Sequence, residues 1–118
     1  MIKFIQCVRR KHGLSKQEFR EHWAAYHEKV TALADASEAK RCILSTALVV
    51  DQNLEIMQSR GTLAPYDGMV EVWWERGVDV VTFLESDDGA VLMEELRRAQ
   101  EEFMDLPKST FFFASEDN

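Results

Sequence analysis

The order of strand-like and helix-like segments is the feature that most constrains this chain. Apolar, β-prone runs cover residues 2–9, 41–51, 68–76 and 109–115, and helical periodicity covers residues 16–36 and 78–103. The order is therefore strand, helix, strand, strand, helix, strand. Right-handed crossovers then favour one four-stranded antiparallel sheet with two helices on one face. We predict a single α+β domain over residues 1–118, with a ferredoxin-like βαββαβ fold.

The first predicted helix begins at a capping box. Ser15 is a favourable N-cap, and Glu18 follows three residues later. The inner face of this helix is expected to carry Phe19, Trp23, Tyr26/His27, Val30 and Leu33/Ala34. His27 lies on the apolar stripe, four residues after Trp23. It is therefore a polar residue at a position where a hydrophobic side chain would suffice for packing.

The rest of the chain carries two interruptions. The second helical region is broken at residues 86–89 (SDDG), which have capping and turn chemistry. Residues 53–67 form a long segment with a short apolar patch and a proline. A loop of this length is uncommon in a small domain unless it is functional or carries a short helix.

Both faces of the predicted sheet are apolar. Trp73 and Trp74 are adjacent, and residues 111–113 are three phenylalanines. In residues 43–50, apolar side chains occur at both odd and even positions, so both faces of that strand would be apolar. Strands that are buried on both faces lose their alternation. We therefore predict a homodimer with the two sheets packed face to face. Glu71 is expected on that interface, because Val70, Val72 and Trp74 suit the face under the helices.

Two cysteines are present, Cys7 and Cys42, each within an apolar run. In this topology the third strand separates their strands, which places them about 10 Å apart. A disulfide needs Cα atoms within about 7 Å. We expect two free, buried thiols.

The charge excludes several classes of partner. The chain has 14 basic and 21 acidic residues and a net charge of −7. Nucleic acids and anionic membrane surfaces are disfavoured because both need clustered Lys and Arg. No apolar run reaches the roughly 18 residues of a membrane helix, and the N-terminus is too short and strand-like for a signal peptide. A cytoplasmic location is expected.

Residues 13–23 (GLSKQEFREHW) and 27–30 (HEKV) resemble the EthD-domain family of the dimeric α+β-barrel superfamily. Residues 85–117 are similar to the C-terminal half of the same family. The chain departs from the family at residues 27–29, where His-Gly-Pro is common and His-Glu-Lys stands here. The resemblance implies a ferredoxin-like subunit, a tight dimer, and a pocket between sheet and helices for a small apolar or aromatic molecule.

His27 is the catalytic candidate. A buried neutral imidazole can exchange protons near neutral pH, which suits enolisation, lactone isomerisation or decarboxylation without a cofactor. The resemblance also places a histidine at this position. The alternative is a histidine that is merely hydrogen-bonded in the core. His12 and His22 are expected to be exposed.

Six residues are candidates for substrate binding. They are Phe19, Trp23, Tyr26, Tyr66, Asp67 and Trp74. The aromatic residues on the helix and strand would shape the cavity, although aromatics at such spacing usually form core. Tyr66 and Asp67 lie in the long segment, where residues have less packing duty, and would assist from there.

Two functions follow. The first is a small cofactor-free protein that binds, and as an enzyme would transform, a hydrophobic or aromatic carbonyl compound from a catabolic or secondary-metabolic pathway. Isomerase, cyclase, decarboxylase or monooxygenase chemistry would fit. The second is a non-catalytic accessory or ligand-binding protein with His27 structural. No metal is expected, because the three histidines lie on separate faces. A haem-binding barrel is disfavoured by the small size of the chain.

Overall fold

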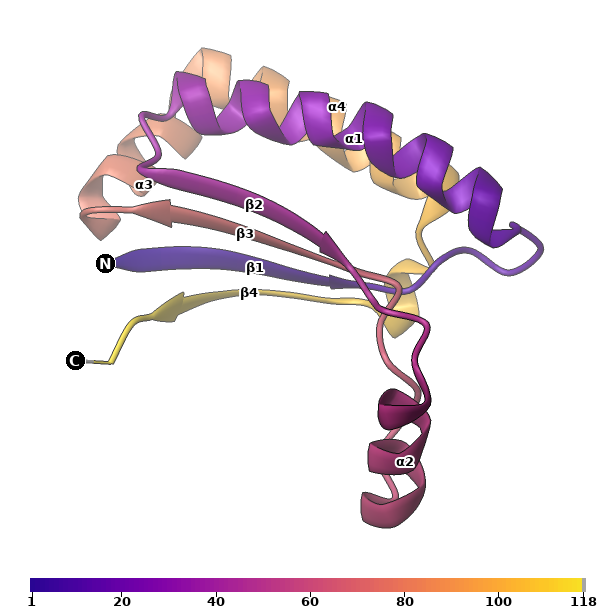
Figure 1. Cartoon of the computed structure of the whole chain (residues 1–118). Helices are drawn as coiled ribbons and strands as arrows, with labels where there is room; N and C mark the ends of the chain where they lie inside the picture. The colour runs from indigo at the N-terminus through magenta and orange to yellow at the C-terminus, as the bar shows by residue number, and fades with distance from the viewer. Residues whose placement is uncertain (118) are drawn as a thin grey trace.

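The computed structural model describes residues 1–117. Its elements follow the predicted order with additions (Figure 1): β1 (Ile2–Val8), α1 (Lys16–Ala36), β2 (Arg41–Thr46), α2 (Asp51–Arg60), β3 (Gly68–Trp74), α3 (Gly77–Leu84), α4 (Asp87–Phe103), the 3-10 turn η1 (Leu106–Lys108) and β4 (Thr110–Ser115). Among these described residues, no helix is long and apolar enough to span a membrane.

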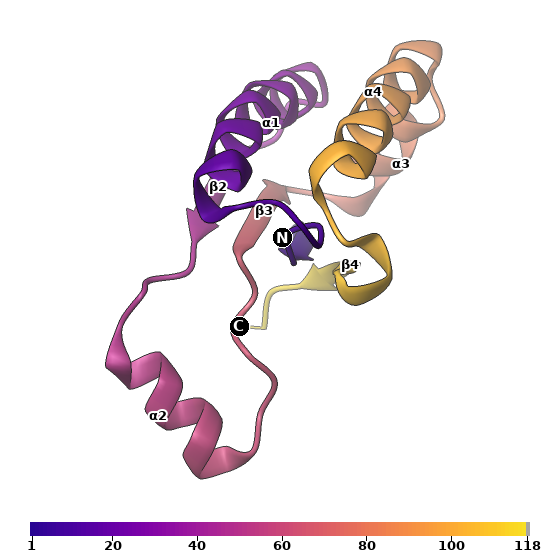
Figure 2. The same cartoon turned by 90° about the vertical axis from the view of Figure 1, so that its right-hand side faces the viewer.

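The sheet is antiparallel with the strand order β2-β3-β1-β4. Figures 1 and 2 show α1 and α4 side by side on one face of it, while the opposite face is uncovered. This is the predicted ferredoxin-like arrangement. The predicted α+β fold class is therefore confirmed.

Helix α1 begins as its sequence predicts. The Ser15 hydroxyl accepts a hydrogen bond from the backbone N–H of Glu18, and the Glu18 carboxylate accepts one from the backbone N–H of Ser15. The second helical region is divided at the predicted break. Ser86 caps α4, and a β-carbon at Gly89 would lie 1.9 Å from the backbone oxygen of Phe83, so only glycine fits this junction.

The core lies between the sheet and the helices. The Phe19 ring stacks on Trp23 at 5.4 Å, and Phe103 of α4 lies against both. Behind them lie buried side chains of β1 and β3, including Val8, Val70 and Val72. This aromatic cluster joins both long helices to the middle of the sheet.

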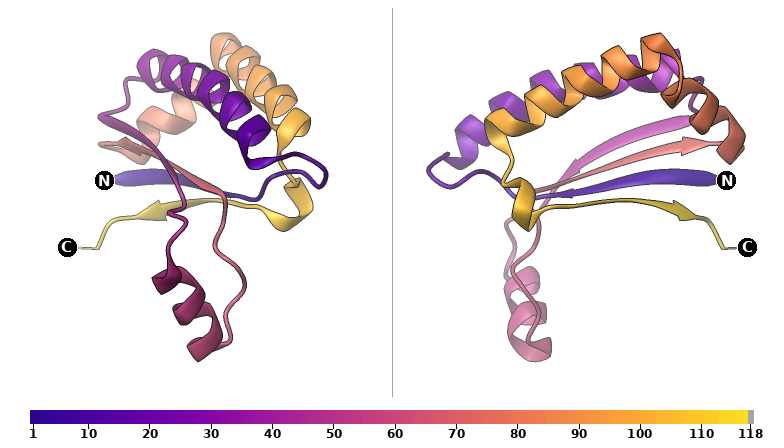
Figure 3. Two further views of the ribbon diagram at one scale, coloured as in Figure 1. Left: turned by 45° about the vertical axis from the view of Figure 1, so that its right-hand side comes forward. Right: turned by 180° about the vertical axis from the view of Figure 1, so that it is seen from behind.

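Two segments differ from the predicted boundaries. β2 ends at Thr46, so the apolar residues 48–50 lie outside the sheet and are exposed. Residues 53–67 are not a simple loop, because they contain most of α2. Residues 47–67 together form an excursion, here named the arm, that projects beyond the plane of the sheet on the side opposite the helices (Figures 1 and 3).

The uncovered face of the sheet carries every second side chain of each strand, namely those that point away from the helices. Glu71 lies there opposite Ile5 and Ile43, and its carboxylate is 4.0 Å from the Lys3 ammonium. The prediction that Glu71 lies away from the helices is confirmed. Cys7 and Cys42 are free thiols on strands separated by β3, as predicted. Both are half-buried, whereas full burial was expected.

Candidate functional site

His27 is exposed, so the expectation that it lies on the inner face of α1 is wrong. The buried set advances by alternating steps of four and three residues: Phe19, Trp23, Tyr26, Val30, Leu33 and Ser37. This alternation selects Tyr26 and places His27 on the flank of the helix. There it borders a shallow outer depression with Ala24 and Thr31. His27 is therefore not a buried imidazole, and its catalytic role stays a prediction.

The other two histidines differ in their exposure. His12 is exposed, as expected. His22 is half-buried and its ring stacks on Phe103 at 5.4 Å, so the expectation of an exposed side chain is wrong for this residue. The other flank of α1 faces α4, which explains the contact.

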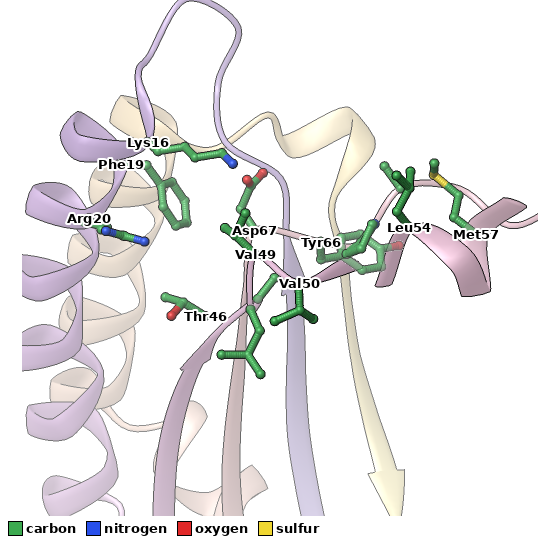
Figure 4. Close-up of a pocket in the computed structure, with 14 residues that line it drawn as sticks. Lys16, Phe19, Arg20, Thr46, Val49, Val50, Leu54, Met57, Tyr66 and Asp67 are labelled. Carbon is green, nitrogen blue, oxygen red and sulfur yellow. The ribbon is translucent and has the colours of Figure 1, made fainter. Parts of the chain in front are cut away.

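A pocket of about 380 Å³ lies between the start of α1 and the arm, and is here named the arm pocket (Figure 4). Its floor includes Phe19, whose ring also belongs to the core. The lining comes from three segments: Lys16, Phe19 and Arg20 of α1; Thr46, Ala47, Leu48, Val49, Val50, Leu54 and Met57; and Ala64, Pro65, Tyr66 and Asp67. The wall is mainly apolar, with a few charged groups at one end.

The charged groups are of both signs. Lys16 and Arg20 lie one turn apart at the N-terminal end of α1, where the helix dipole adds further positive potential. Asp67 supplies a carboxylate on the facing side, and Figure 4 shows the Lys16 side chain extending toward it. The pocket therefore offers positive charge to a ligand oxygen in an overall acidic protein.

Two arginines at the end of β1 hold the loop that carries Tyr66 and Asp67. The Arg10 backbone N–H donates to the Asp67 carboxylate at 2.7 Å, and the Arg10 guanidinium lies 3.9 Å from it. The Arg9 guanidinium lies 4.3 Å from the centre of the Tyr66 ring and donates to the Pro65 carbonyl. The Tyr66 hydroxyl pairs with Thr110 at 3.1 Å. This wall of the pocket is fixed by contacts.

The structure brings three of the predicted site residues together in the arm pocket: Phe19, Tyr66 and Asp67. Trp23 and Tyr26 lie in the packed core instead. The Tyr26 hydroxyl donates to the Gln6 side-chain oxygen at 2.7 Å and accepts from the Gln100 amide at 2.9 Å. Burial raises the pKa of Tyr26 to about 12, although both hydrogen bonds oppose this shift. The phenol is therefore a neutral, fully partnered group.

Trp74 lies at the other end of the sheet, away from the arm pocket. Its indole N–H donates to Ser37 at 2.9 Å. It borders a cavity of about 60 Å³ between sheet and helices, with Leu33 and Val80 among its apolar walls. The pocket implied at that place by the resemblance is therefore far smaller than a ligand site of a few hundred Å³.

Several pocket residues were not predicted from the sequence. These are chiefly Lys16, Arg20, Thr46, Val49, Val50, Leu54 and Met57. One feature of the sequence points to this pocket. The apolar residues 48–50 continue past Thr46, where β2 ends. Within residues 1–117, no group of three or more His, Cys, Asp or Glu side chains is arranged to hold a metal ion.

Comparison with known proteins identifies the family. The EthD domain model matches residues 11–107. A search of curated proteins found no match.

Three solved structures share the fold. An EthD-family protein from Bacillus halodurans superposes with a TM-score of 0.65 at 14% identity, covering 99% of each chain. A dimeric ferredoxin-like protein from Bacteroides fragilis gives 0.63 at 10% identity, covering 98% of this chain and 95% of its own. SnoaB, a cofactor-independent oxygenase from Streptomyces nogalater, gives 0.55 at 12% identity, covering 99% and 93%. The chain belongs to the EthD domain family.

Proposed function

We propose that the chain is a homodimeric protein that binds a small hydrophobic or aromatic carbonyl compound in the arm pocket. The observation that carries this proposal is the pairing of an apolar wall with Lys16 and Arg20 at one end of a 380 Å³ pocket. Ligand sites are typically clefts of this size, mainly apolar and with few polar groups. The apolar body of a ligand would contact Phe19 and Leu54, and its oxygen would face the cations.

The same groups support a proton transfer. The Asp67 carboxylate would take a proton from the carbon next to the carbonyl. The C–H electron pair then forms a carbon–carbon double bond, and the carbonyl oxygen becomes an enolate oxygen. Lys16 and Arg20 would stabilise that negative charge. If the compound also carries a carbon–carbon double bond between its β and γ carbons, the enolate is a dienolate. Return of the proton to the γ carbon then moves the double bond to the α and β carbons and completes an isomerisation.

Binding without catalysis is the second candidate function. It is favoured by the contacts of Asp67, whose carboxylate already accepts a hydrogen bond from Arg10 and fixes the loop. A carboxylate with this structural task has less freedom to act as a base. Both candidate functions use the arm pocket, and only the catalytic one predicts turnover of the bound compound.

The homodimer is proposed through the uncovered sheet face. Strand pairing and alternation place seven apolar residues on that face: Ile5, Cys7, Ile43, Met69, Trp73, Phe112 and Ala114. The same face also carries Lys3, Arg41 and Glu71. A mainly apolar sheet face without a covering element favours an interaction site. The similar protein from Bacteroides fragilis is described as dimeric.

A thermal-shift screen with lactones and phenolic acids tests the binding proposal. The dissociation constant of the strongest compound is then measured for wild type, Lys16→Ala and Lys29→Ala. Lys29 is an exposed lysine of the same helix that does not line the pocket. We expect Lys16→Ala to weaken binding about tenfold, as for loss of a charge-assisted hydrogen bond, and Lys29→Ala to bind as wild type. Equal affinities in all three, or no compound bound, would contradict the proposal.

A further inference from the structure

The arm is the most apolar exposed part of the described chain. Its exposed large hydrophobic side chains are Leu48, Val49, Val50, Leu54, Ile56 and Leu63, and the Leu63 side chain reaches 80% exposure. Only some of these serve the arm pocket. Leu54 lines it, whereas Ile56 and Leu63 do not.

Helix α2 carries one large hydrophobic residue, Ile56, on the side opposite Leu54. At 100° per residue, Ile56 lies about 160° around the helix from Leu54. Leu54 and Met57 face the arm pocket, so Ile56 points away from it. Within residues 1–117, the Ile56 side chain stays 48% exposed.

The length of α2 supports the same conclusion. It has 10 residues, none of which is buried, and its N-cap residue Val50 makes no side-chain capping bond. Isolated helices shorter than about 12 residues are marginal in water. Gly61 provides a left-handed C-cap, but one cap does not replace packing. The helix needs a surface that the rest of the subunit does not provide.

The arm lies beside the uncovered face of the sheet. Figures 1 and 3 show α2 beyond the uncovered face of the sheet, near the end of β2 and the start of β3. At the corner between arm and sheet face lies a hollow of about 170 Å³, lined by Cys7, Ser45, Thr46, Ala47, Tyr66, Gly68 and Met69. Thr46, Ala47 and Tyr66 line the arm pocket as well. The corner hollow therefore connects the sheet face with the arm.

We propose that the arm packs on the second copy of this chain, and that the partner covers the side of α2 that carries Ile56. This inference rests on the proposed homodimer and extends it. A copy seated on the sheet face would lie beside the arm, because both border the same corner. Each subunit would then hold the partner's arm in place, and the ligand site would be complete only in the dimer.

Photo-crosslinking tests where the arm lies. A benzophenone side chain is placed at position 63 of the full chain, and at position 91 as the control. Val91 is an exposed residue of α4, on the helix side of the molecule. We expect a crosslinked product of dimer mass from position 63 and none from position 91. Crosslinks from position 63 only within one chain would overturn the inference, and so would dimer-mass product from both positions equally.

A second measurement uses sedimentation. The double variant Ile56→Asp/Leu63→Asp is compared with Val91→Asp. All three substituted side chains are exposed in the single chain, so the fold of each variant should be retained. We expect the dimer dissociation constant to rise at least tenfold in the double variant alone. An unchanged constant, or a monomeric wild type, would overturn the inference. Neither measurement uses a ligand, so failure of the binding proposal would leave these outcomes unaffected.

Discussion

A β-carbon on Gly68 would lie 2.7 Å from Cη2 of Trp23. The indole of α1 therefore packs directly on the backbone of the first residue of β3. This contact joins the aromatic cluster to the root of the arm, because Gly68 follows Asp67 in the chain. A substitution to alanine has to displace a large, buried ring. We expect Gly68→Ala to lower the free energy of unfolding by about 1–3 kcal/mol, measured by urea denaturation.

Gly77→Ala is the matched control for this substitution. A β-carbon there would lie 3.7 Å from Ile2, which is an ordinary contact, and Gly77 is at the start of α3. The variant should be as stable as wild type, or up to about 1 kcal/mol more stable. Equal effects of the two substitutions would show that the Trp23 contact is not the cause.

Tyr26→Phe removes the hydroxyl that links Gln6 and Gln100. Both amide side chains are buried, so the variant leaves an acceptor and a donor without a partner. We expect a loss of about 1–3 kcal/mol in the free energy of unfolding. Tyr66→Phe, whose hydroxyl pairs with Thr110 at an exposed position, should change stability by about 0.5 kcal/mol or less. If Tyr26→Phe were as mild, the buried network would contribute little.

The raised pKa of Tyr26 predicts an alkaline loss of stability. The unfolded phenol titrates near 10, whereas the folded one titrates at about 12. Ionisation therefore favours the unfolded chain above pH 10, and the loss grows until about pH 12. Its contribution is about 2–3 kcal/mol. Urea denaturation between pH 9 and 12 should show this fall for wild type and a smaller one for Tyr26→Phe. Parallel pH profiles would contradict the assignment.

The strand and helix order was predictable because it depends on local signals. The Ser15–Glu18 capping box predicted the start of α1, and the break at residues 86–89 predicted two helices in place of one. The apolar parity of β3 also predicted that Glu71 lies on the uncovered face. Each of these features is decided within a few residues of the chain.

The candidate site was predictable only in part. The periodicity of α1 left Tyr26 and His27 as neighbours on one stripe, and only packing against the sheet chose between them. The arm pocket depends on how residues 47–67 leave the sheet, which no local pattern determines. Tyr66 and Asp67 are predictable because they lie in a long segment between strands, and Phe19 because it lies on the apolar stripe of α1. Leu54 and Met57 carry no comparable signal.

His27→Ala tests the catalytic prediction for that residue. Because the imidazole is exposed and borders only a shallow depression, we expect the variant to keep the stability of wild type and its affinity for any compound bound in the arm pocket. Thermal denaturation and calorimetric titration measure both. Loss of turnover in a folded variant would show that His27 is catalytic. The active site would then lie on the outer face of α1.

Chemical-shift mapping of a bound compound tests the central claim, that the arm pocket is the ligand site. The ¹⁵N–¹H spectrum of the labelled protein is followed during titration with the strongest compound from the screen. We expect shifts concentrated in residues 16–20, 46–50 and 64–67, the segments that line the pocket. Shifts centred on the buried network of Gln6, Tyr26 and Gln100, or on the outer face at His27, would contradict it.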